Sequence, residues 1–558
     1  MDFLITIVEQ GLIYGILALG VYITYRILDF PDLTVDGSFP LGAAVTAALI
    51  TRGVNPYLTL PLSFAAGVLA GICTGLIHVK FKVRDLLSGI IMMTALYTVN
   101  LVVAGTNNVP LFSQETIFNN SMLTGIFGEQ IPGALTIGVI LVVALVCKLL
   151  LDFYMKTKSG YLLRAVGDNE NLVTSLAKDK GNVKILGLAI SNGLVALGGC
   201  VFCQEEKVFD ISVGTGSMVI GLASVIIGVS LFRKVTFVKA TTAVFVGAII
   251  YKACVAAAIR FFEPQAMKLI TAVLFLVILV ISMERKQKKK FSFRKPGKEE
   301  AMLELQHIAK YYNPGTVNEM CLFQDFNLTV KDGQFVSVVG SNGSGKTSLL
   351  NLICGSIDLD AGAIVMDGKD ITGEKEYRRL RRIGRVYQNP AMGTCPNMTI
   401  LENLAMADNK GKFFGLGRGT DKSRIDHYRE MLRQLNLGLE DKLQVKVGSL
   451  SGGQRQAMSL LMSTMTPIDF LILDEHTAAL DPKTAERIME LTDKIVKEKK
   501  LTTIMVTHNL RYAVEYGDRL LMMHQGKAVM DLEGEEKKNL KVEQILDQFN
   551  AISIECGN

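Results

Sequence analysis

The feature of this sequence that most constrains its fold is a series of long apolar runs, which fills the first half of the chain. An α-helix needs about 20 apolar residues to cross the hydrocarbon core of a bilayer. Runs of about this length occur at 3–26, 56–77, 86–105, 133–151, 184–204, 211–231, 236–259 and 266–283. From residue 284 onward the composition is that of a soluble protein. We therefore expect a helical membrane domain at 1–283, a basic cytoplasmic linker at 284–301 and a soluble domain at 302–558.

A shorter apolar run at 40–50 follows a stretch, 29–38, that is too polar for contact with lipid. Such backbone is tolerated at membrane depth only where protein or an aqueous cavity surrounds it. We expect 29–50 to form a short or broken helix near the substrate path, with an interfacial loop as the alternative. If the run crosses the membrane, the chain has nine spans and its N-terminus lies outside. If the run is re-entrant, there are eight spans and both ends lie inside.

Basic residues indicate which loops face the cytoplasm. They gather at Lys80, Lys82 and Arg84, at Lys156 through Lys184, at Arg233 and Lys234, and from Arg285 to Lys298. The loop at 106–132 has no Lys or Arg and is expected outside. Because the net charge of +6 comes from these membrane-flanking groups, orientation in a bilayer explains it better than a nucleic-acid partner does.

A few polar residues within the apolar half need separate interpretation. Glu9 and Lys252 lie inside predicted spans and are candidate transport residues, although each is close enough to a helix end to snorkel. Cys200 and Cys203 form a C-x-x-C pattern inside an apolar helix, where a packing role is expected. The N-terminus lacks the pattern of a cleaved signal peptide, so the first apolar run is expected to stay.

The predicted inside segment at 156–184 is the longest cytoplasmic break before the linker. Asp168 or Asn169 could cap a short helix that runs to Lys178. A short exposed helix here would transmit force from an ATPase to the membrane helices. A solvated loop is the alternative.

The soluble domain contains a glycine-rich run that lies between an apolar strand at 335–339 and a helical run at 348–354. Its residues are Gly340-Ser341-Asn342-Gly343-Ser344-Gly345-Lys346-Thr347. This context is typical of a phosphate loop, whose backbone N–H groups and helix N-terminus bind phosphates. Lys346 would hold the β and γ phosphates of ATP, and Thr347 would bind Mg²⁺, with Ser348 completing the loop's part of the site.

A second apolar strand, 470–473, ends in two acidic residues. An acid at the C-terminal end of a strand can reach the magnesium ion, and the next acid can polarise the attacking water. We assign these roles to Asp474 and Glu475. These two elements alone leave a generic P-loop ATPase as the alternative.

A further motif resembles the signature of the ABC family and removes that alternative. It reads Leu450-Ser451-Gly452-Gly453-Gln454-Arg455-Gln456. Other positions also resemble those of the family. Gln388 matches the Q-loop glutamine, which also reaches the metal, Ala479-Leu480-Asp481 matches the D-loop, and His508 matches the switch histidine. Tyr312 matches the ring that stacks on adenine, and the neighbouring Tyr311 is the alternative. The resemblance implies an α/β P-loop fold with a RecA-like core, an antiparallel β subdomain and a helical signature subdomain. His476 departs from the family, which usually has Pro there, but we still expect hydrolysis.

In the ABC family, the phosphate loop of one domain and the signature motif of another enclose each nucleotide. This chain carries one copy of each motif, so Ser451, Gly452, Gly453, Gln454 and Asp481 imply a partner. The simplest partner is a second identical chain related by a two-fold axis, and a related chain is the alternative.

The membrane half resembles permeases of branched-chain amino-acid importers, in the Asp36-Gly37-Ser38 region and in the run from Arg164 to Asn169. The resemblance is closest to bacterial importers for tryptophan or tyrosine. It implies import across the cell membrane, an ATPase in the cytoplasm and a separate extracytoplasmic solute-binding lipoprotein. Export is the first alternative, although exporters of this type carry six long helices. An ATPase that transmits force to an envelope partner is the second, although such proteins usually have a large external domain.

Overall fold

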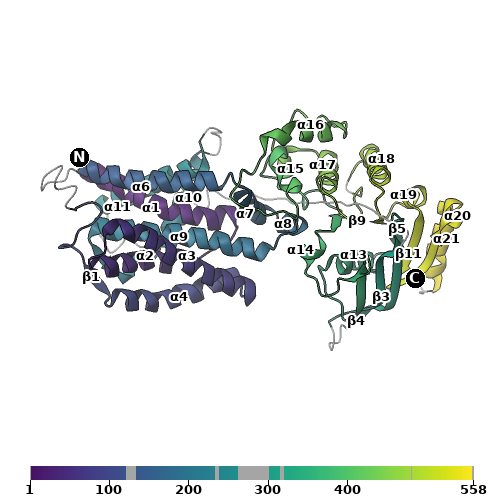
Figure 1. The fold of residues 1–558 in the computed structure, drawn as a ribbon, viewed down its shortest axis with the longest axis horizontal. Helices are drawn as coiled ribbons and strands as arrows, with labels where there is room; N and C mark the ends of the chain where they lie inside the picture. The colour runs from purple at the N-terminus through teal and green to yellow at the C-terminus, as the bar shows by residue number, and fades with distance from the viewer. Residues whose placement is uncertain are drawn as a thin grey trace. The chain divides into compact units, whose positions relative to one another are not determined.

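The computed structural model describes residues 2–120, 133–232, 238–261, 301–313, 319–478 and 480–555. The chain divides into two compact units (Figure 1). The first comprises Met1–Lys156 with Lys180–Lys286, and the second comprises Thr157–Asp179 with Gln287–Asn558. The segment Thr157–Asp179, although it interrupts the apolar half of the sequence, therefore packs with the soluble half. The domain boundaries expected at 283 and 301 border residues 262–300, which lie outside the described residues, and they stay predictions.

Helices of membrane length build the first unit. Among the described residues, seven helices are long and apolar enough to cross a membrane. They are α1 (Asp2–Val21) with a π-helical continuation (Tyr22–Ile27), α3 (Pro56–Lys80), α4 (Asp85–Ala104), α6 (Gly133–Tyr154), α9 (Lys180–Glu206), α10 (Ser217–Leu231) and α11 (Ala240–Phe261). Each coincides with a predicted run. The predicted span at 266–283 lies outside the described residues, as do Arg233 and Lys234.

Helix α9 is the central helix of this unit and packs against α1, α3 and the short helix α2 (Val35–Ile50). Glycines allow the backbones of α2 and α9 to touch. A Cβ atom on Gly42 would lie 1.8 Å from the Ala196 carbonyl oxygen, and one on Gly199 would lie 1.9 Å from that of Phe39. Small residues are the usual means of such close helix packing in membranes. Cys200 and Cys203 are fully buried on the same helix.

The irregular stretch predicted at 29–50 is a break followed by a short helix. With 16 residues, α2 is about 24 Å long, which is less than the roughly 30 Å of a bilayer core. A buried network holds the break: Asn192 donates from Nδ2 to Asp32 Oδ2 at 2.8 Å, and Ser38 Oγ donates to Asn192 Oδ1 at 2.7 Å. The prediction of a short or broken helix is confirmed.

The Asp36-Gly37-Ser38 motif ties α2 to three other helices. Asp36 accepts the backbone N–H groups of Gly216 and Met218 at 3.1 and 2.7 Å, and so caps the start of α10. The Gly37 carbonyl accepts from Asn100 of α4, and Ser38 reaches α9. A carboxylate at a helix N-terminus is stabilising, so this motif organises the packing around the break.

Contacts at one end of the helices bear on the direction of the chain. Gln10 near the start of α1 donates from Nε2 to Glu206 Oε1 at the end of α9, at a distance of 3.0 Å. At the same end, Gln204 donates to the Pro56 carbonyl at the start of α3. The start of α1 and the end of α9 therefore lie at the same end of the helices. If the segment before α9 is cytoplasmic, as predicted, this end and the N-terminus lie outside, and the orientation stays a prediction.

Lys252 and Glu9, the candidate transport residues, lie towards this end of the helices. The Lys252 ammonium donates to Gln10 Oε1 at 3.1 Å and lies 3.5 Å from the centre of the Tyr14 ring. Glu9 is largely buried on α1. A two-stranded ladder, β1 (Asn108–Pro110) with β2 (Val208–Asp210), closes the loops there.

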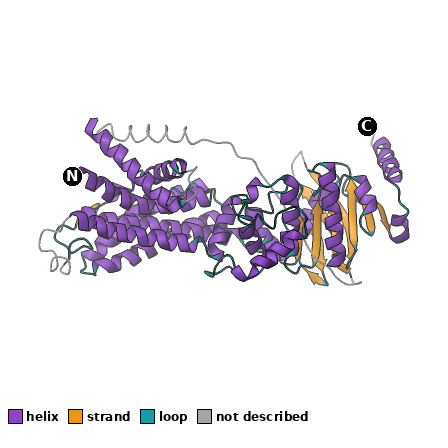
Figure 2. Ribbon diagram, turned by 90° about the horizontal axis from the view of Figure 1, so that it is seen from above, coloured by secondary structure: helices purple, strands orange, loops and turns teal. Residues whose placement is uncertain are grey.

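Two sheets form the framework of the second unit, shown in orange in Figure 2. The six-stranded sheet has the order β12 (Lys527–Glu533), β11 (Arg519–His524), β5 (Phe335–Gly340), β10 (Thr503–Val506), β9 (Phe470–Asp474), β8 (Ile383–Val386). Its strands are parallel except β12. The antiparallel sheet has the order β4 (Met320–Lys331), β3 (Ala301–Tyr312), β6 (Ala361–Met366), β7 (Lys369–Asp370).

Helices cover the sheets and build a separate helical region around the signature motif. They are α7 (Lys158–Asp168), α8 (Glu170–Ser175), α13 (Lys346–Cys354), α14 (Glu376–Arg379), α15 (Ile400–Asp408), α16 (Ile425–Arg433), α17 (Gly452–Thr464), α18 (Pro482–Glu498), α19 (Leu510–Glu515), α20 (Gly534–Lys538) and α21 (Val542–Glu555). The central strands β5, β9 and β10 are buried along their whole length, which explains their continuous apolar sequences. The predicted fold class is confirmed.

His476 replaces the family's usual Pro and lies inside this unit. Its residue surface is 2% exposed, and its Nε2 lies 3.2 Å from Thr492 Oγ1 of α18. Burial lowers the pKa of His476 from the ordinary value of 6.5 to about 3. The imidazole is therefore neutral in the folded protein at neutral pH.

We predict that a His476→Gln variant is less sensitive to acid than the parent chain. Because the folded pKa is the lower one, the unfolded chain binds the extra proton, so stability is lost as pH falls below 6.5. As pH falls, the parent chain should lose up to about 1.4 kcal/mol of unfolding free energy per pH unit relative to the His476→Gln variant. Urea unfolding near neutral pH and about two units lower measures this. Equal acid sensitivity would show that His476 accepts its proton in the folded state.

Candidate active site

The glycine-rich run forms a loop between β5 and α13, as predicted. Gly343 and Gly345 have φ angles of 80° and 98°, a region that favours glycine and turns successive N–H groups into the loop. The Lys346 ammonium crosses the loop and donates to the carbonyls of Gly340 and Ser341 at 2.8 and 2.9 Å. Burial lowers the pKa of Lys346, while the charges of Glu475 and Asp474 act in the opposite direction.

The hydroxyl groups of this loop also fit a phosphate chain. Ser344 Oγ is buried and has no hydrogen-bond partner among the described residues, so it can donate to a ligand. Thr347 and Ser348 occupy the first turn of α13, whose N-terminus favours negative charge. Asn342 lies in the turn between strand and helix. We therefore keep the whole predicted loop as the candidate phosphate site.

The structure separates the two candidate adenine-stacking rings. The Tyr312 hydroxyl lies 3.3 Å from Ser348 Oγ, so this side chain reaches the helix that follows the phosphate loop. Tyr311 is next to it on β3 and points to the other face, where its strand neighbour is Cys321. The geometry favours Tyr312 over Tyr311.

Gln388 and His508, which are far apart in the sequence, both contact Glu475. Gln388 Nε2 lies 2.5 Å from Glu475 Oε2, and His508 Nε2 lies 2.8 Å from Glu475 Oε1. Glu475 has a φ angle of 53°, which is uncommon for a residue with a side chain, and its N–H donates to the Val506 carbonyl at 2.8 Å. Strained backbone of this kind clusters at active sites. The adjoining cleft has a volume of about 400 Å³ and is also lined by Thr477.

This arrangement suits the hydrolysis of a phosphoanhydride. The Glu475 carboxylate can accept a proton from water, while Gln388 and His508 fix the direction of its two oxygens. Thr347, Gln388 and Asp474 offer hydroxyl, amide and carboxylate oxygens, the donor types that Mg²⁺ prefers. When bound, Mg²⁺ would neutralise charge on the phosphates.

Arg385 is a residue of this site that sequence reasoning missed. Its Nη2 lies 3.5 Å from Asp474 Oδ2 and 2.5 Å from Asn351 Oδ1 of α13. Its guanidinium also stacks 4.1 Å from the centre of the Tyr387 ring. Arg385 therefore connects the strand before Gln388 with the proposed metal-binding carboxylate. The sequence contained a sign of this role, because a single charged residue within the buried strand β8 needs a buried partner.

The signature and D-loop residues make mostly local interactions in one chain. Ser451 caps α17: its hydroxyl accepts the N–H of Gln454 at 3.3 Å, and its own backbone N–H donates to Gln454 Oε1 at 3.2 Å. Asp481 caps α18 by accepting the Thr484 N–H. Hydrogen bonds from the Thr484 side chain and backbone lower the Asp481 pKa. Gly452 and Gly453 form the first turn of α17, where a Cβ on Gly453 would lie 2.3 Å from Thr484 Cγ2. Ala479 of the D-loop lies outside the described residues.

The segment Thr157–Asp179 folds as α7 and α8, whose first turns are capped by Thr157 and Asn169. Asn169 is therefore the predicted cap, although α8 ends at Ser175 and does not reach Lys178. Figure 1 shows α7 and α8 beside α14 and α15. The side chain of Asn169 donates to the carbonyls of Ala391 and Thr394 at 3.2 and 3.1 Å.

Two charged side chains of α7 strengthen this attachment. Arg164 forms an ion pair with Glu402 of α15 at 2.9 Å, and Asp168 accepts the backbone N–H of Asn397 at 3.0 Å. The contacted stretch, 391–402, begins three residues after Gln388. The segment predicted to receive force from an ATPase thus contacts the ATPase fold just after Gln388, within the second unit.

We predict that Glu475→Gln lowers ATP hydrolysis by at least about 100-fold while nucleotide binding persists, because the amide cannot take the proton from water. Steady-state phosphate release and binding of a fluorescent ATP analogue measure the two effects. Glu498→Gln, at the exposed end of α18, is the control and should keep the parent rate. Undiminished turnover in Glu475→Gln would exclude Glu475 as the base.

Comparison with known proteins finds relatives of both halves of the chain. The family described as branched-chain amino acid transport system/permease component matches residues 3–282, and the ABC transporter family matches residues 323–478. The tyrosine transport ATP-binding protein of Clostridioides difficile (strain R20291) is 46% identical over 44% of this chain and 98% of its own length. The tyrosine transport system permease protein of the same organism is 43% identical over 50% of this chain and 91% of its own. A solved nucleotide-free ATP-binding cassette from an ABC transporter covers 46% of this chain and 100% of its own at 23% identity, with a TM-score of 0.38.

The first family match spans half of the chain, and the second contains the phosphate loop, the signature motif and Glu475. Two proteins that are separate in the relatives thus occupy one polypeptide here. The chain belongs to the ABC transporters, as a multi-pass permease of the branched-chain amino-acid transport type fused to the ABC ATPase whose ATP hydrolysis is coupled to transport.

Proposed function

We propose that this chain imports an amino acid or a similar compound across the cell membrane, driven by hydrolysis of MgATP in the cytoplasm. The observation that carries the proposal is that the two halves resemble two components of one tyrosine transport system. An aromatic amino acid is the first solute to test. A separate extracytoplasmic solute-binding lipoprotein would deliver it.

The functional assembly in this proposal is a homodimer. Within one chain the Ser451 hydroxyl bonds to Gln454 of its own helix, and the phosphate loop follows the C-terminal end of β5. A second chain would bring its Ser451 and Gly453 to the ATP held by Lys346 of the first. A two-fold axis completes both sites with the same contacts, so two identical chains suffice.

Residues in the second unit would pass the state of the nucleotide to the membrane helices. Gln388 contacts Glu475, and the stretch just after Gln388 holds Asn169 between α7 and α8. The chain continues from these helices into α6 on one side and α9 on the other. A shift of Gln388 on ATP binding would therefore pull on two membrane helices at once.

The proposal is tested by uptake into proteoliposomes that contain ATP and carry the purified chain. The proposed solute-binding lipoprotein and radiolabelled tyrosine are added outside. Accumulation should require both ATP and the lipoprotein and should be abolished by Glu475→Gln. Unlabelled aromatic amino acids should compete, whereas nucleosides and sugars should not.

Two results would contradict the proposal. ATP-driven loss of preloaded amino acid, without any need for the lipoprotein, would indicate export. ATP hydrolysis that is unaffected by any lipoprotein–solute pair, with no flux in either direction, would favour an ATPase that transmits force.

A further inference from the structure

A glycine-rich loop of the ABC unit, Gly411–Thr420, exposes apolar side chains to solvent. The surface of Phe413 is 86% exposed and that of Leu416 is 67% exposed. By contrast, Phe414 between them is buried, and Lys178 Nζ lies 5.3 Å from the centre of its ring. The loop is thus anchored by one aromatic residue and presents its two neighbours outward.

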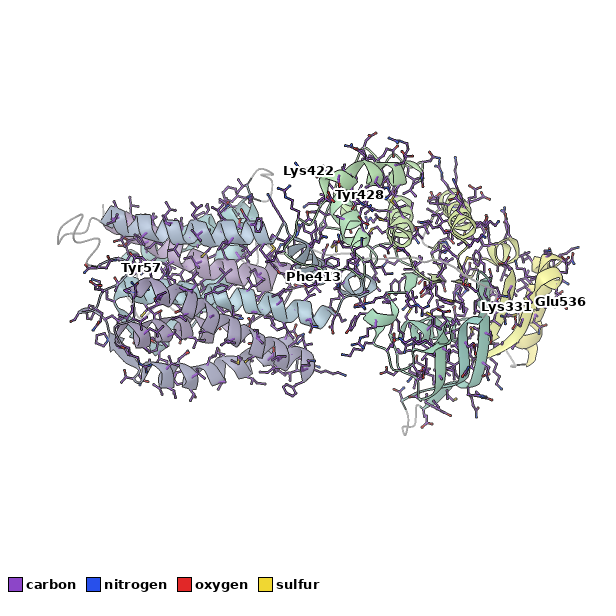
Figure 3. The ribbon with its side chains drawn as sticks, in the orientation of Figure 1. Tyr57, Lys331, Phe413, Lys422, Tyr428 and Glu536 are labelled. Carbon is purple, nitrogen blue, oxygen red and sulfur yellow. The ribbon has the colours of Figure 1, made fainter. Side chains whose placement is uncertain are left out.

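The same loop is rich in positive charge. Between residues 411 and 422 there are three basic side chains, Lys412, Arg418 and Lys422, and one acidic side chain, Asp421. All four residues are exposed, and Figure 3 labels Phe413 and Lys422. Exposed aromatic and aliphatic groups among basic residues are typical of surfaces that bind at the lipid headgroup level.

Hydrogen bonds fix this loop to the first residues of the segment that leaves the membrane. The N–H groups of Lys158 and Ser159 donate to the carbonyls of Gly417 and Gly415 at 2.9 and 3.1 Å. The Tyr161 hydroxyl lies 3.0 Å from Thr420 Oγ1. The loop therefore moves with the N-terminal end of α7.

Covalent connectivity keeps this anchor close to the bilayer. The apolar helix α6 ends at Tyr154, and only Met155 and Lys156 separate it from Thr157. Three residues of extended chain span at most about 10 Å. A loop bonded to residues 157–161 must therefore lie within reach of the headgroups where α6 leaves the membrane.

We propose that Phe413 and Leu416 insert into the headgroup region of the cytoplasmic leaflet, where Lys412, Arg418 and Lys422 bind anionic phospholipids. The contact would hold the start of α7 at the membrane surface. It does not depend on the identity or direction of the transported solute.

The chain contains no tryptophan, so one substitution creates a specific reporter. The full-length Phe413→Trp protein is reconstituted in phosphatidylcholine with or without phosphatidylglycerol, using lipids with or without bromine on the acyl chains. We expect blue-shifted emission, loss of at least half of it with brominated lipid, and protection from iodide. Met320→Trp, on the exposed side of β4, is the control and should stay open to iodide and insensitive to bromine.

A charge variant tests the choice of lipid. Lys412→Glu with Arg418→Glu, in the Phe413→Trp background, should remove the increase in quenching that phosphatidylglycerol causes. Equal iodide access in the Phe413→Trp and Met320→Trp proteins would show that the loop faces water. Blue-shifted emission without quenching by brominated lipid would show that the loop packs against protein. Either result overturns the proposal.

Discussion

The side-chain amide of Asn169 fastens α7 and α8, which interrupt the membrane half of the sequence, to the ATPase fold. Its oxygen caps α8, and its nitrogen donates to two carbonyls of the stretch that follows Gln388. One side chain thus sets both the local fold of the coupling segment and its attachment to the ATPase. Asp168 and Arg164, which precede Asn169 on α7, add a hydrogen bond to the Asn397 N–H and an ion pair with Glu402.

This attachment continues directly into the candidate catalytic centre. Gln388 bonds to Glu475, whose strained backbone is fixed by the neighbouring strand β10. Arg385, three residues before Gln388, reaches Asp474. A single short run, from β8 to α15, therefore contacts the candidate metal-binding acid, the candidate base and helices α7 and α8. Coupling of this kind needs an element with two arrangements that both sites can bias, and this run is the natural candidate.

Sequence reasoning predicted the described spans and the phosphate loop, because apolar length and glycine spacing are visible in short stretches of sequence. It placed Glu475, Gln388 and His508 in one site because their motifs resemble those of the ABC family. Other features required three-dimensional contacts. Tyr312 and Tyr311 are equivalent in the sequence, and only strand alternation separates them. The role of Arg385 depends on packing between β8, β9 and α13. The break before α2 is held by the Asp32 network with α9, which no local pattern specifies.

If Asn169 transmits the state of the ATP site to transport, the ratio of solute moved to ATP hydrolysed should fall in an Asn169→Asp variant. This change keeps an oxygen to cap α8 but removes both N–H donors to residues 391 and 394. We expect folded protein and near-parental ATP hydrolysis, with the transport ratio reduced at least about ten-fold, which corresponds to roughly 1.4 kcal/mol of lost coupling. An unchanged ratio would show that Asn169 does not transmit the state of the ATP site.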